Sequence, residues 1–195
     1  MIIPLERRNV MDNGASSYRR FLEGDSNGLV EIIRDYKDGL ILYLNGIVQN
    51  LYVAEDLTED TFVKLVVKKP YFSGRSSFKT WLYAIARNVA IDYLRSDAKI
   101  KEISVDEFHN MANDEENLEQ TYIRFEDKIT VHRALSKLKS EYRQVIYLTF
   151  FEGLDNKQAA KVMRKSKRQI ENLIYRAKMS LKEQLIKEGF SYEEL

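Results

Sequence analysis

The stretch LDNKQAAKVMRKSKRQIENLIYRAKMSLKEQL, residues 154–185, contains two helix-start signals eleven residues apart. Asp155 is followed three residues later by Gln158, and Ser166 is followed in the same way by Gln169. In each pair the first side chain can accept a hydrogen bond from a backbone N–H of the first turn, while the second reaches back. The stretch therefore predicts a short helix, a tight connection and a second helix, which is the pattern of a helix-turn-helix.

The second of these helices is expected to separate an apolar face from a polar, mostly basic one. The apolar face carries Ile170, Leu173, Ile174, Ala177 and Leu181. The residues left facing outward are Lys167, Arg168, Glu171, Asn172, Tyr175 and Lys178. Lys and Arg neutralise phosphates, and Asn or Gln can pair with adenine in the major groove, so the pattern favours DNA binding. The alternative is an ordinary helical hairpin with a basic exposed face.

The distribution of charge supports a polyanionic partner. The whole chain carries only +1, but residues 133–182 contain 13 basic and 4 acidic side chains, for +9. The preceding segment, 97–132, carries −6. A strongly basic segment behind an acidic one suggests that the basic part binds a polyanion. A lysine-coated helical surface that is kept soluble by repulsion is the alternative.

Composition indicates an all-α protein. The 195 residues include eight Gly and two Pro, too few for a turn-rich β fold, and 44% are hydrophobic. There is no cysteine, which fits a reducing cytosol, and no apolar run of about 18 residues or secretion signal. We therefore expect a cytoplasmic protein that does not span a membrane.

The chain is expected to form two small helical domains joined by an acidic linker. We predict a flexible arm over 1–16, a first helical domain over 17–96, a linker over 97–127, a helix-turn-helix domain over 128–187 and a tail over 188–195. Within the first domain we expect helices near 17–23, across 26–50 with a break near Gly39, over about 54–68, and over 76–95.

The last of these helices, SSFKTWLYAIARNVAIDYLR at residues 76–95, has two different faces. Its apolar face carries Phe78, Leu82, Ile85, Val89 and Tyr93 at helical spacing. The opposite face brings together Thr80, Arg87, Asn88 and Arg95, beside Trp81 and Tyr83. Large rings next to cations and an amide suit unstacked nucleic acid, because bases need a π-surface and the backbone needs cations.

These two stretches, in this order and at this spacing, resemble sigma-70-family initiation factors of the extracytoplasmic-function (ECF) type. FKTWLYAIARNVAIDYLR is similar to the most diagnostic part of region 2, and YRRFLEGDSNGLVEII and AEDLTEDTFVKL look like its start and centre. SEYRQVIYLTFFEGLDNKQAAKVM and QIENLIYRAKMSLKEQL look like region 4. The resemblance extends from Tyr18 to Leu185.

The resemblance implies two partners, core RNA polymerase and promoter DNA, and makes an anti-sigma factor a candidate third. It implies −10 contacts by Arg75, Ser76, Phe78, Lys79, Trp81, Arg87, Asn88 and Arg95. For the −35 element it implies Lys165, Lys167, Arg168, Gln169, Glu171, Asn172, Tyr175, Arg176 and Lys178. The polymerase contact would be made by Asp56, Glu59, Asp60 and Lys64.

Structural alternatives stand beside several of these roles. Trp81 could equally be a core residue, and Phe78 is better explained by burial than by stacking on a base. Arg87 and Arg95 could simply pair with Asp92 or Asp97.

Departures from the family pattern occur in region 4. Its turn often has Gly, whereas here Arg164 or Lys165 must serve, at about 1 kcal/mol if φ is positive. Glu171, Asn172 and Leu173 also differ from the basic or small residues that are common in the recognition helix, which bears on the DNA sequence preferred.

Nothing in the sequence suggests an enzyme. His109 and His132 are isolated, there is no cysteine, and no Gly-rich phosphate loop follows a strand. We expect no catalytic residue, metal, cofactor or small-molecule substrate. Two other functions are compatible with the pattern: a stand-alone helix-turn-helix regulator, and a helical bundle that binds an acidic protein.

Overall fold

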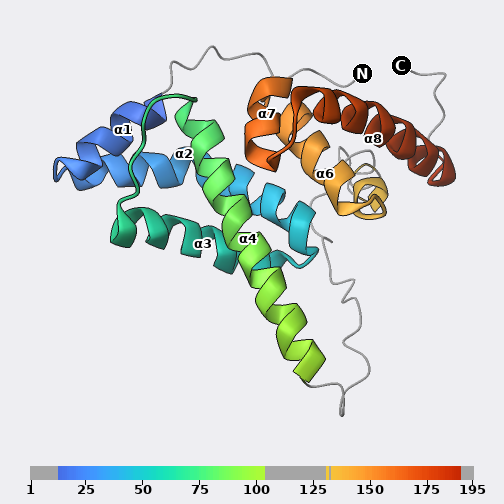
Figure 1. Ribbon diagram of the computed structural model, residues 1–195, viewed down its shortest axis with the longest axis horizontal. Helices are drawn as coiled ribbons and strands as arrows, with labels where there is room; N and C mark the ends of the chain where they lie inside the picture. Colours follow the sequence, from blue (N-terminus) through green and yellow to red (C-terminus); the bar gives the residue numbers. More distant parts are fainter. Residues whose placement is uncertain (1–12, 104–130, 132, 190–195) are drawn as a thin grey trace, which may run out of the picture.

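The computed structural model describes residues 13–103, 131 and 133–189, and within these ranges it is helical without a strand. The helices are α1 (Asn13–Leu22), α2 (Ser26–Val48), α3 (Leu51–Lys68), α4 (Phe78–Ile103), α6 (Ser140–Ile146), the π-helix η1 (Tyr147–Phe151), α7 (Asn156–Met163) and α8 (Lys167–Lys187) (Figure 1). None of the helices described has the length and apolar character needed to cross a bilayer.

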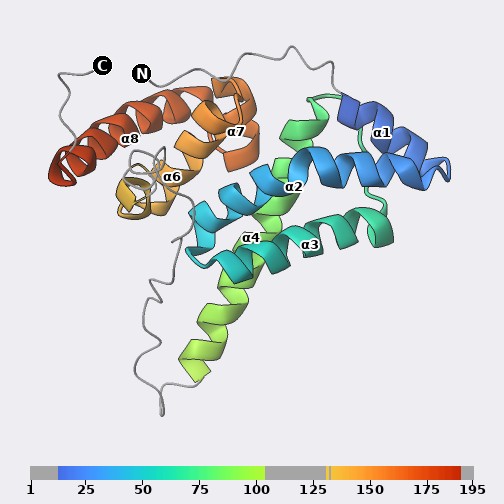
Figure 2. The same cartoon turned by 180° about the vertical axis from the view of Figure 1, so that it is seen from behind.

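Helices α1 and α3 pack against α2, and α2 and α4 cross each other (Figure 2). Their centre is an aromatic cluster around Phe78, whose ring is fully buried. The ring centroids of Tyr18 and Phe72 lie 5.5 and 5.7 Å from that of Phe78. Large rings bury much apolar area and pack well at such tilted angles, so this cluster fixes the start of α4 against α1 and α2.

Local caps set the ends of α2 and α3. Asp25 accepts a hydrogen bond from the backbone N–H of Asn27, and Asn50 accepts one from Val53. Gln49 and Lys69 end the two helices in the left-handed conformation, with φ of 55° and 41°. The predicted start of the third helix at 54 is therefore three residues late, because the Asn50 cap begins it at Leu51.

The break that we predicted near Gly39 is wrong, because α2 continues without interruption through this residue. A Cβ atom at Gly39 would lie 2.5 Å from Tyr83 Oη and 2.6 Å from Glu152 Oε1. The glycine therefore permits a close approach of α4 and the C-terminal helices to α2, and does not end the helix.

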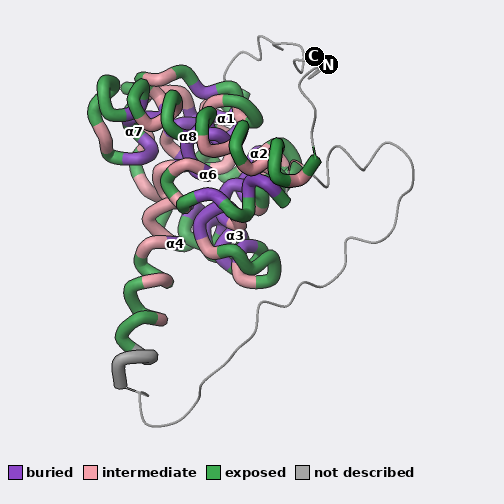
Figure 3. The backbone as a smooth tube through the Cα atoms, turned by 90° about the vertical axis from the view of Figure 1, so that its right-hand side faces the viewer, coloured by how far each residue is buried: buried purple, intermediate pink, exposed green. Residues whose placement is uncertain are grey.

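Two helix boundaries also differ from the predicted ones. Helix α1 begins at Asn13, inside the arm predicted over 1–16, because Gly14 packs directly under the Phe78 ring. Helix α4 runs on to Ile103 instead of ending at the predicted linker, and its last turns project away from the other helices (Figure 3). Residues 1–12, 104–130 and 190–195 lie outside the described ranges, as do His109, Ile129 and His132.

The C-terminal helices pack directly against the first four, with α7 against α4 and α6 against α2. The expected core residues Leu135, Leu138, Val145, Ile146 and Leu148 are buried, in the same cluster as the core of the first domain. Arg143 on α6 is also buried, and its Nε donates to the backbone oxygen of Gly46 on α2 over 2.9 Å. The two domains thus form one closed arrangement.

Candidate nucleic-acid interface

Both predicted capping boxes are present in the helix-turn-helix. Asp155 Oδ1 accepts from the N–H groups of Lys157 and Gln158 at 2.8 and 2.7 Å, and Gln158 Oε1 accepts from the N–H of Asp155. Ser166 and Gln169 repeat this exchange at 3.2 and 2.7 Å. The caps satisfy backbone donors that the first turn leaves free, so they fix where α7 and α8 begin.

The turn between α7 and α8 uses a left-handed arginine where glycine would be relaxed. Arg164 has φ of 53° and ψ of 46°, and its N–H caps α7 by donating to the backbone oxygen of Ala160. The predicted non-glycine turn residue is therefore Arg164, at a strain of roughly 1–2 kcal/mol.

Helix α8 presents its polar face to solvent. Ile170 and Ala177 are buried, and Leu173, Ile174 and Leu181 pack against the same core. The exposed residues are Lys167, Arg168, Gln169, Glu171, Asn172, Tyr175, Arg176 and Lys178, which are all of the predicted −35 residues except Lys165. Lys165 is partly buried and pairs with Glu141 at 2.8 Å.

Glu171, which would be unfavourable beside phosphates, lies 3.5 Å from Lys167 one turn earlier. The pair neutralises the carboxylate within α8, so a DNA backbone would meet a face that remains cationic overall. Tyr175 keeps 69% of its surface exposed in the middle of this face.

The polar face of α4 is only partly accessible. Arg95 is exposed, and its Nη1 lies 3.6 Å from Asp92 Oδ1. The pairing of Arg95 with Asp92, which was the structural alternative, is therefore present, but the distance between the charged atoms is long. Arg87 pairs with neither Asp92 nor Asp97: its Nε donates to Gln144 Oε1 on α6 over 3.2 Å. Asn88 is half-buried between these two arginines along the helix.

Two residues expected on or beside that polar face, Thr80 and Tyr83, are instead buried. Tyr83 packs against Tyr43 of α2, and burial, followed by the nearby carboxylate of Glu152, raises the pKa of Tyr83 well above its usual value. On the apolar face, Tyr93 is 37% exposed because α4 has by then left the core.

The aromatic residues of this segment differ in access. Phe78 is enclosed by other rings, and in this conformation a base cannot reach it. Trp81 is half-buried, with ring centroids 5.3 Å from Tyr18 and 5.2 Å from Phe72. Phe78 thus positions Trp81, whose remaining surface lies at the start of α4.

The C-terminal helices contact the start of α4 and the loop before it through polar groups. Lys79 Nζ lies 2.6 Å from Glu152 Oε2 and donates to the Glu152 backbone oxygen over 2.8 Å. Gln158 Nε2 donates to Ser77 Oγ over 3.3 Å, and Lys161 Nζ donates to the backbone oxygen of Arg75 over 2.8 Å. Arg75 itself is exposed and Ser76 is half-buried.

The N-terminal and C-terminal halves of the chain match two different family models. Residues 32–100 match the family described as Sigma-70 region 2, and residues 128–181 match Sigma-70, region 4. The two matches together cover more than half of the chain. The chain belongs to the sigma-70 family, as a sigma factor of the ECF type.

Its relatives include RNA polymerase sigma factor YlaC of Bacillus subtilis (strain 168), with 28% identity over 83% of this chain and 94% of the relative. ECF RNA polymerase sigma factor SigM of the same strain is 26% identical over 78% of this chain and 91% of the relative. The sigma factor RpoE of Bartonella quintana, solved in complex with the anti-sigma factor NepR, shares the fold. It has a TM-score of 0.65 and 23% identity, over 80% of this chain and 94% of that one.

Within region 2, helix α3 carries the four residues predicted to contact the polymerase. Asp56, Glu59, Asp60 and Lys64 are all exposed, whereas Leu57 on the same helix is buried as expected. Next to Glu59, α2 and α3 form an open hollow of about 420 Å³ whose apolar lining is Leu29, Ile33, Phe62, Val63, Val66 and Val67. The exposed valines 63, 66 and 67 had no role in the sequence-based prediction.

Sequence reasoning also missed the region 4 residues that pair with region 2. Gln144, Glu152 and Gln158 contact Arg87, Lys79 and Ser77, at sequence separations of 57, 73 and 81 residues. Their side chains belong to a helix, a helix end and a capping box, so no local pattern marks them.

Proposed function

We propose that this sigma factor directs core RNA polymerase to promoters, reading a −35 element with region 4 and capturing an opened −10 element with region 2. The observation that carries the proposal is the exposed polar face of α8, whose N-terminal end is fixed by the Ser166 capping box. A recognition helix contacts base edges with this end when it lies in the major groove.

The side chains on α8 divide into two roles. Lys167 and Arg168 can neutralise phosphates and position the helix, whereas Gln169 and Asn172 can form paired hydrogen bonds to adenine. The phosphate contacts supply affinity for any duplex, and the amides supply preference for a sequence.

Region 2 offers the chemistry for separated strands. Arg95 is exposed, Asn88 is half-buried beside it along α4, and Trp81 keeps part of its ring accessible. Stacking on a ring is worth about 1–3 kcal/mol per base, which offsets the few kcal/mol of unstacking. The protein would thus melt DNA by binding the opened form, without catalysis of its own.

Both DNA contacts cannot be made in the closed arrangement. The positions that name the −10 and −35 elements are about 25 base pairs apart, which is roughly 85 Å along B-DNA. Regions 2 and 4 are in direct contact at 2.6–3.3 Å through Lys79, Arg87 and Ser77. Promoter binding therefore requires the two regions to separate, with α3 attaching region 2 to the polymerase.

This activity implies a cytoplasmic protein that works with core RNA polymerase and promoter DNA. An anti-sigma factor is a further proposed partner, since the related fold of RpoE was solved with one. An inhibitor that held regions 2 and 4 together would keep the −10 residues covered.

Run-off transcription with core polymerase and a broad promoter library tests the proposal. We expect promoter-dependent transcripts, and we expect Arg95→Ala to reduce open-complex formation while core binding is unchanged. Arg19→Ala is the matched control, because Arg19 is an exposed cation on α1 outside both DNA surfaces. Equal loss of core binding and open complexes in Arg95→Ala would show that Arg95 is structural.

The same experiment distinguishes a stand-alone regulator. Such a protein would bind a duplex tightly without polymerase and would show no affinity for the core enzyme. Absence of promoter-dependent transcripts together with that binding pattern would replace the proposal.

A further inference from the structure

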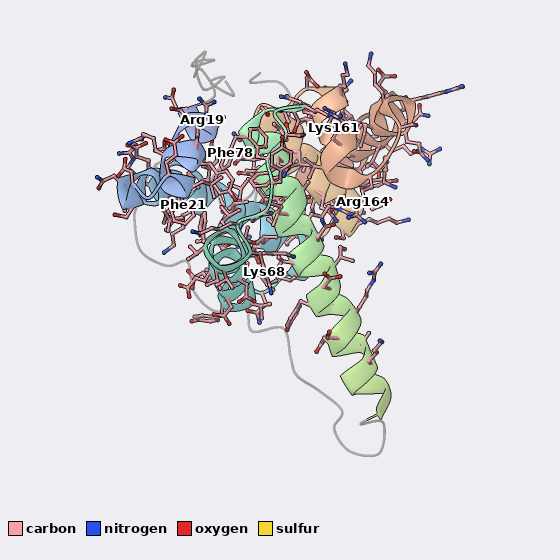
Figure 4. The ribbon with its side chains drawn as sticks, turned by 60° about the vertical axis from the view of Figure 1, so that its left-hand side comes forward. Arg19, Phe21, Lys68, Phe78, Lys161 and Arg164 are labelled. Atoms are coloured by element: carbon pink, nitrogen blue, oxygen red, sulfur yellow. The ribbon has the colours of Figure 1, made fainter. Side chains whose placement is uncertain are left out.

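A strongly basic pocket lies between region 2 and region 4. It has a volume of about 460 Å³ and is formed by side chains of α3 and α4 together with the end of α7. Its charged and amide lining consists of Lys64, Arg87, Asn88, Asp92, Arg95 and Arg164. Arg164 is contributed by region 4 at the point where α7 approaches α4 (Figure 4).

The cations of this pocket are not balanced by its one carboxylate. Asp92 lies 3.6 Å from Arg95, a distance too long for a strong pair, and Arg87 is bonded to the neutral amide of Gln144. Within the described residues, no ion pair reaches Lys64 or Arg164. Four cations that converge on one hollow repel each other, and a bound anion would remove that repulsion.

The backbone at Arg164 also bears on the position of its side chain. Its φ of 53° is one that glycine adopts without strain and that an arginine adopts at a cost. The same left-handed conformation ends α2 at Gln49 and α3 at Lys69, so at Arg164 it marks the end of α7, and at this helix end the residue is an arginine whose guanidinium lines the pocket.

We propose that this pocket binds a small phosphate-bearing anion when regions 2 and 4 are packed together. Guanidinium groups pair with phosphate oxygens in a bidentate manner, and Lys64 adds a point charge. The volume is in the range of small-ligand sites, roughly 300–1,000 Å³. Ile91 and Met163 form a limited apolar wall, which could contact a nucleoside but is not required by an inorganic phosphate.

The ligand would favour the closed arrangement. The pocket is complete only when Arg164 and Met163 of region 4 lie against α4, so a ligand that needs them stabilises that state. It would also occupy Arg87, Asn88 and Arg95, and this consequence rests on the proposed −10 role of those residues. A phosphate-bearing metabolite would thereby hold the sigma factor away from DNA.

Calorimetric titration of the full chain with pyrophosphate and, separately, ATP tests the site. We expect saturable one-to-one binding of at least one probe, weakened about tenfold or more in Arg164→Gly, which removes the guanidinium and relaxes the turn. Arg19→Ala should bind as the unaltered chain does. Stronger binding of ATP than of pyrophosphate identifies a nucleotide, and the reverse order identifies an inorganic phosphate. Heats no larger than those of sodium chloride at equal ionic strength, or equal affinity in Arg164→Gly, would overturn the proposal.

A distance measurement tests the closed-state requirement without using transcription. The chain has no cysteine, so Lys68→Cys on α3 and Met179→Cys on α8 can be labelled specifically for energy transfer. We expect the probe to increase transfer in this pair and not in the same pair carrying Arg164→Gly. Binding without any change in transfer would refute the closed-state requirement. Both readouts remain decisive even if the chain directs no transcription, so this proposal and the proposed function fail separately.

Discussion

Replacing Arg143 with methionine should lower the free energy of unfolding by about 3 kcal/mol. The Arg143 residue is 5% exposed, and burial lowers the pKa of its guanidinium. It donates to the backbone oxygens of Gly46 and Ser136 at 2.9 and 2.8 Å, and also to that of Leu138. Each buried carbonyl that loses its donor costs about 1–3 kcal/mol, and removing a desolvated charge returns part of the total.

The bond to Gly46 has a particular role because it crosses between the regions. Gly46 lies in the last turn of α2, where carbonyls lack partners within the helix and the helix dipole favours a cation. Arg143 of region 4 therefore caps a helix of region 2. Its loss should weaken the closed arrangement as well as the fold.

Urea unfolding followed by circular dichroism measures this change, and a melting temperature lower by about 6–12 °C should accompany it. Arg133→Met is the control, because Arg133 is 60% exposed and its carboxylate partner in Glu188 lies 3.8 Å away. That variant should lose less than about 1 kcal/mol. If Arg143→Met proved no less stable than Arg133→Met, the assignment of Arg143 as an inter-region cap would be wrong.

Three further predictions concern separate parts of the molecule. Gly39→Leu should push region 4 from α2, with overpacking of about 1–3 kcal/mol, and increase the radius of gyration in small-angle scattering; an unchanged radius would contradict the close approach. Burial raises the pKa of Tyr18 to about 12, so the unfolded chain ionises first and stability should fall from about pH 10 to 12. In denaturation experiments over that pH range, the free energy of unfolding should fall less steeply with pH in Tyr18→Phe. An identical slope would show that Tyr18 does not contribute to the pH dependence of stability. Arg168→Ala should reduce the salt slope of duplex binding by about 1, whereas Asn172→Ala should alter sequence preference at an unchanged slope.

The helix-turn-helix was predictable because its determinants are local. Asp155 and Gln158, and likewise Ser166 and Gln169, are three residues apart, so their exchange of hydrogen bonds depends only on the first turn of each helix. The turn at Arg164 follows from the spacing between them. The separation of buried Ile170 and Ala177 from the exposed face of α8 follows equally from helical periodicity.

Features whose causes lie elsewhere in the chain were not predictable in this way. A glycine in the middle of a helical pattern suggests a break, but Gly39 is required by Tyr83 and Glu152, which are distant in sequence. The π-helix η1 has no local signal in YLTFF, although its bond from the Glu152 N–H to the Tyr147 oxygen closes one wide turn. This turn places Glu152 beside Lys79, and it thereby covers part of the proposed −10 surface.

The contacts that cover region 2 differ in how easily DNA could replace them. Among the described residues, the one carboxylate paired with Arg95 is that of Asp92 at 3.6 Å, with both side chains exposed, and Arg87 is held by a neutral amide. Lys79 has a close carboxylate in Glu152, which is 15% exposed, and it also donates to the Glu152 backbone oxygen, so it is held more firmly than the two arginines. Phosphates can therefore displace the partners of Arg95 and Arg87 at small cost, and that of Lys79 at a larger one. The bond from Arg143 to Gly46 is different, because it is buried and no DNA group can take its place. Opening of the two regions should accordingly be limited by Arg143 and not by the residues proposed to bind DNA.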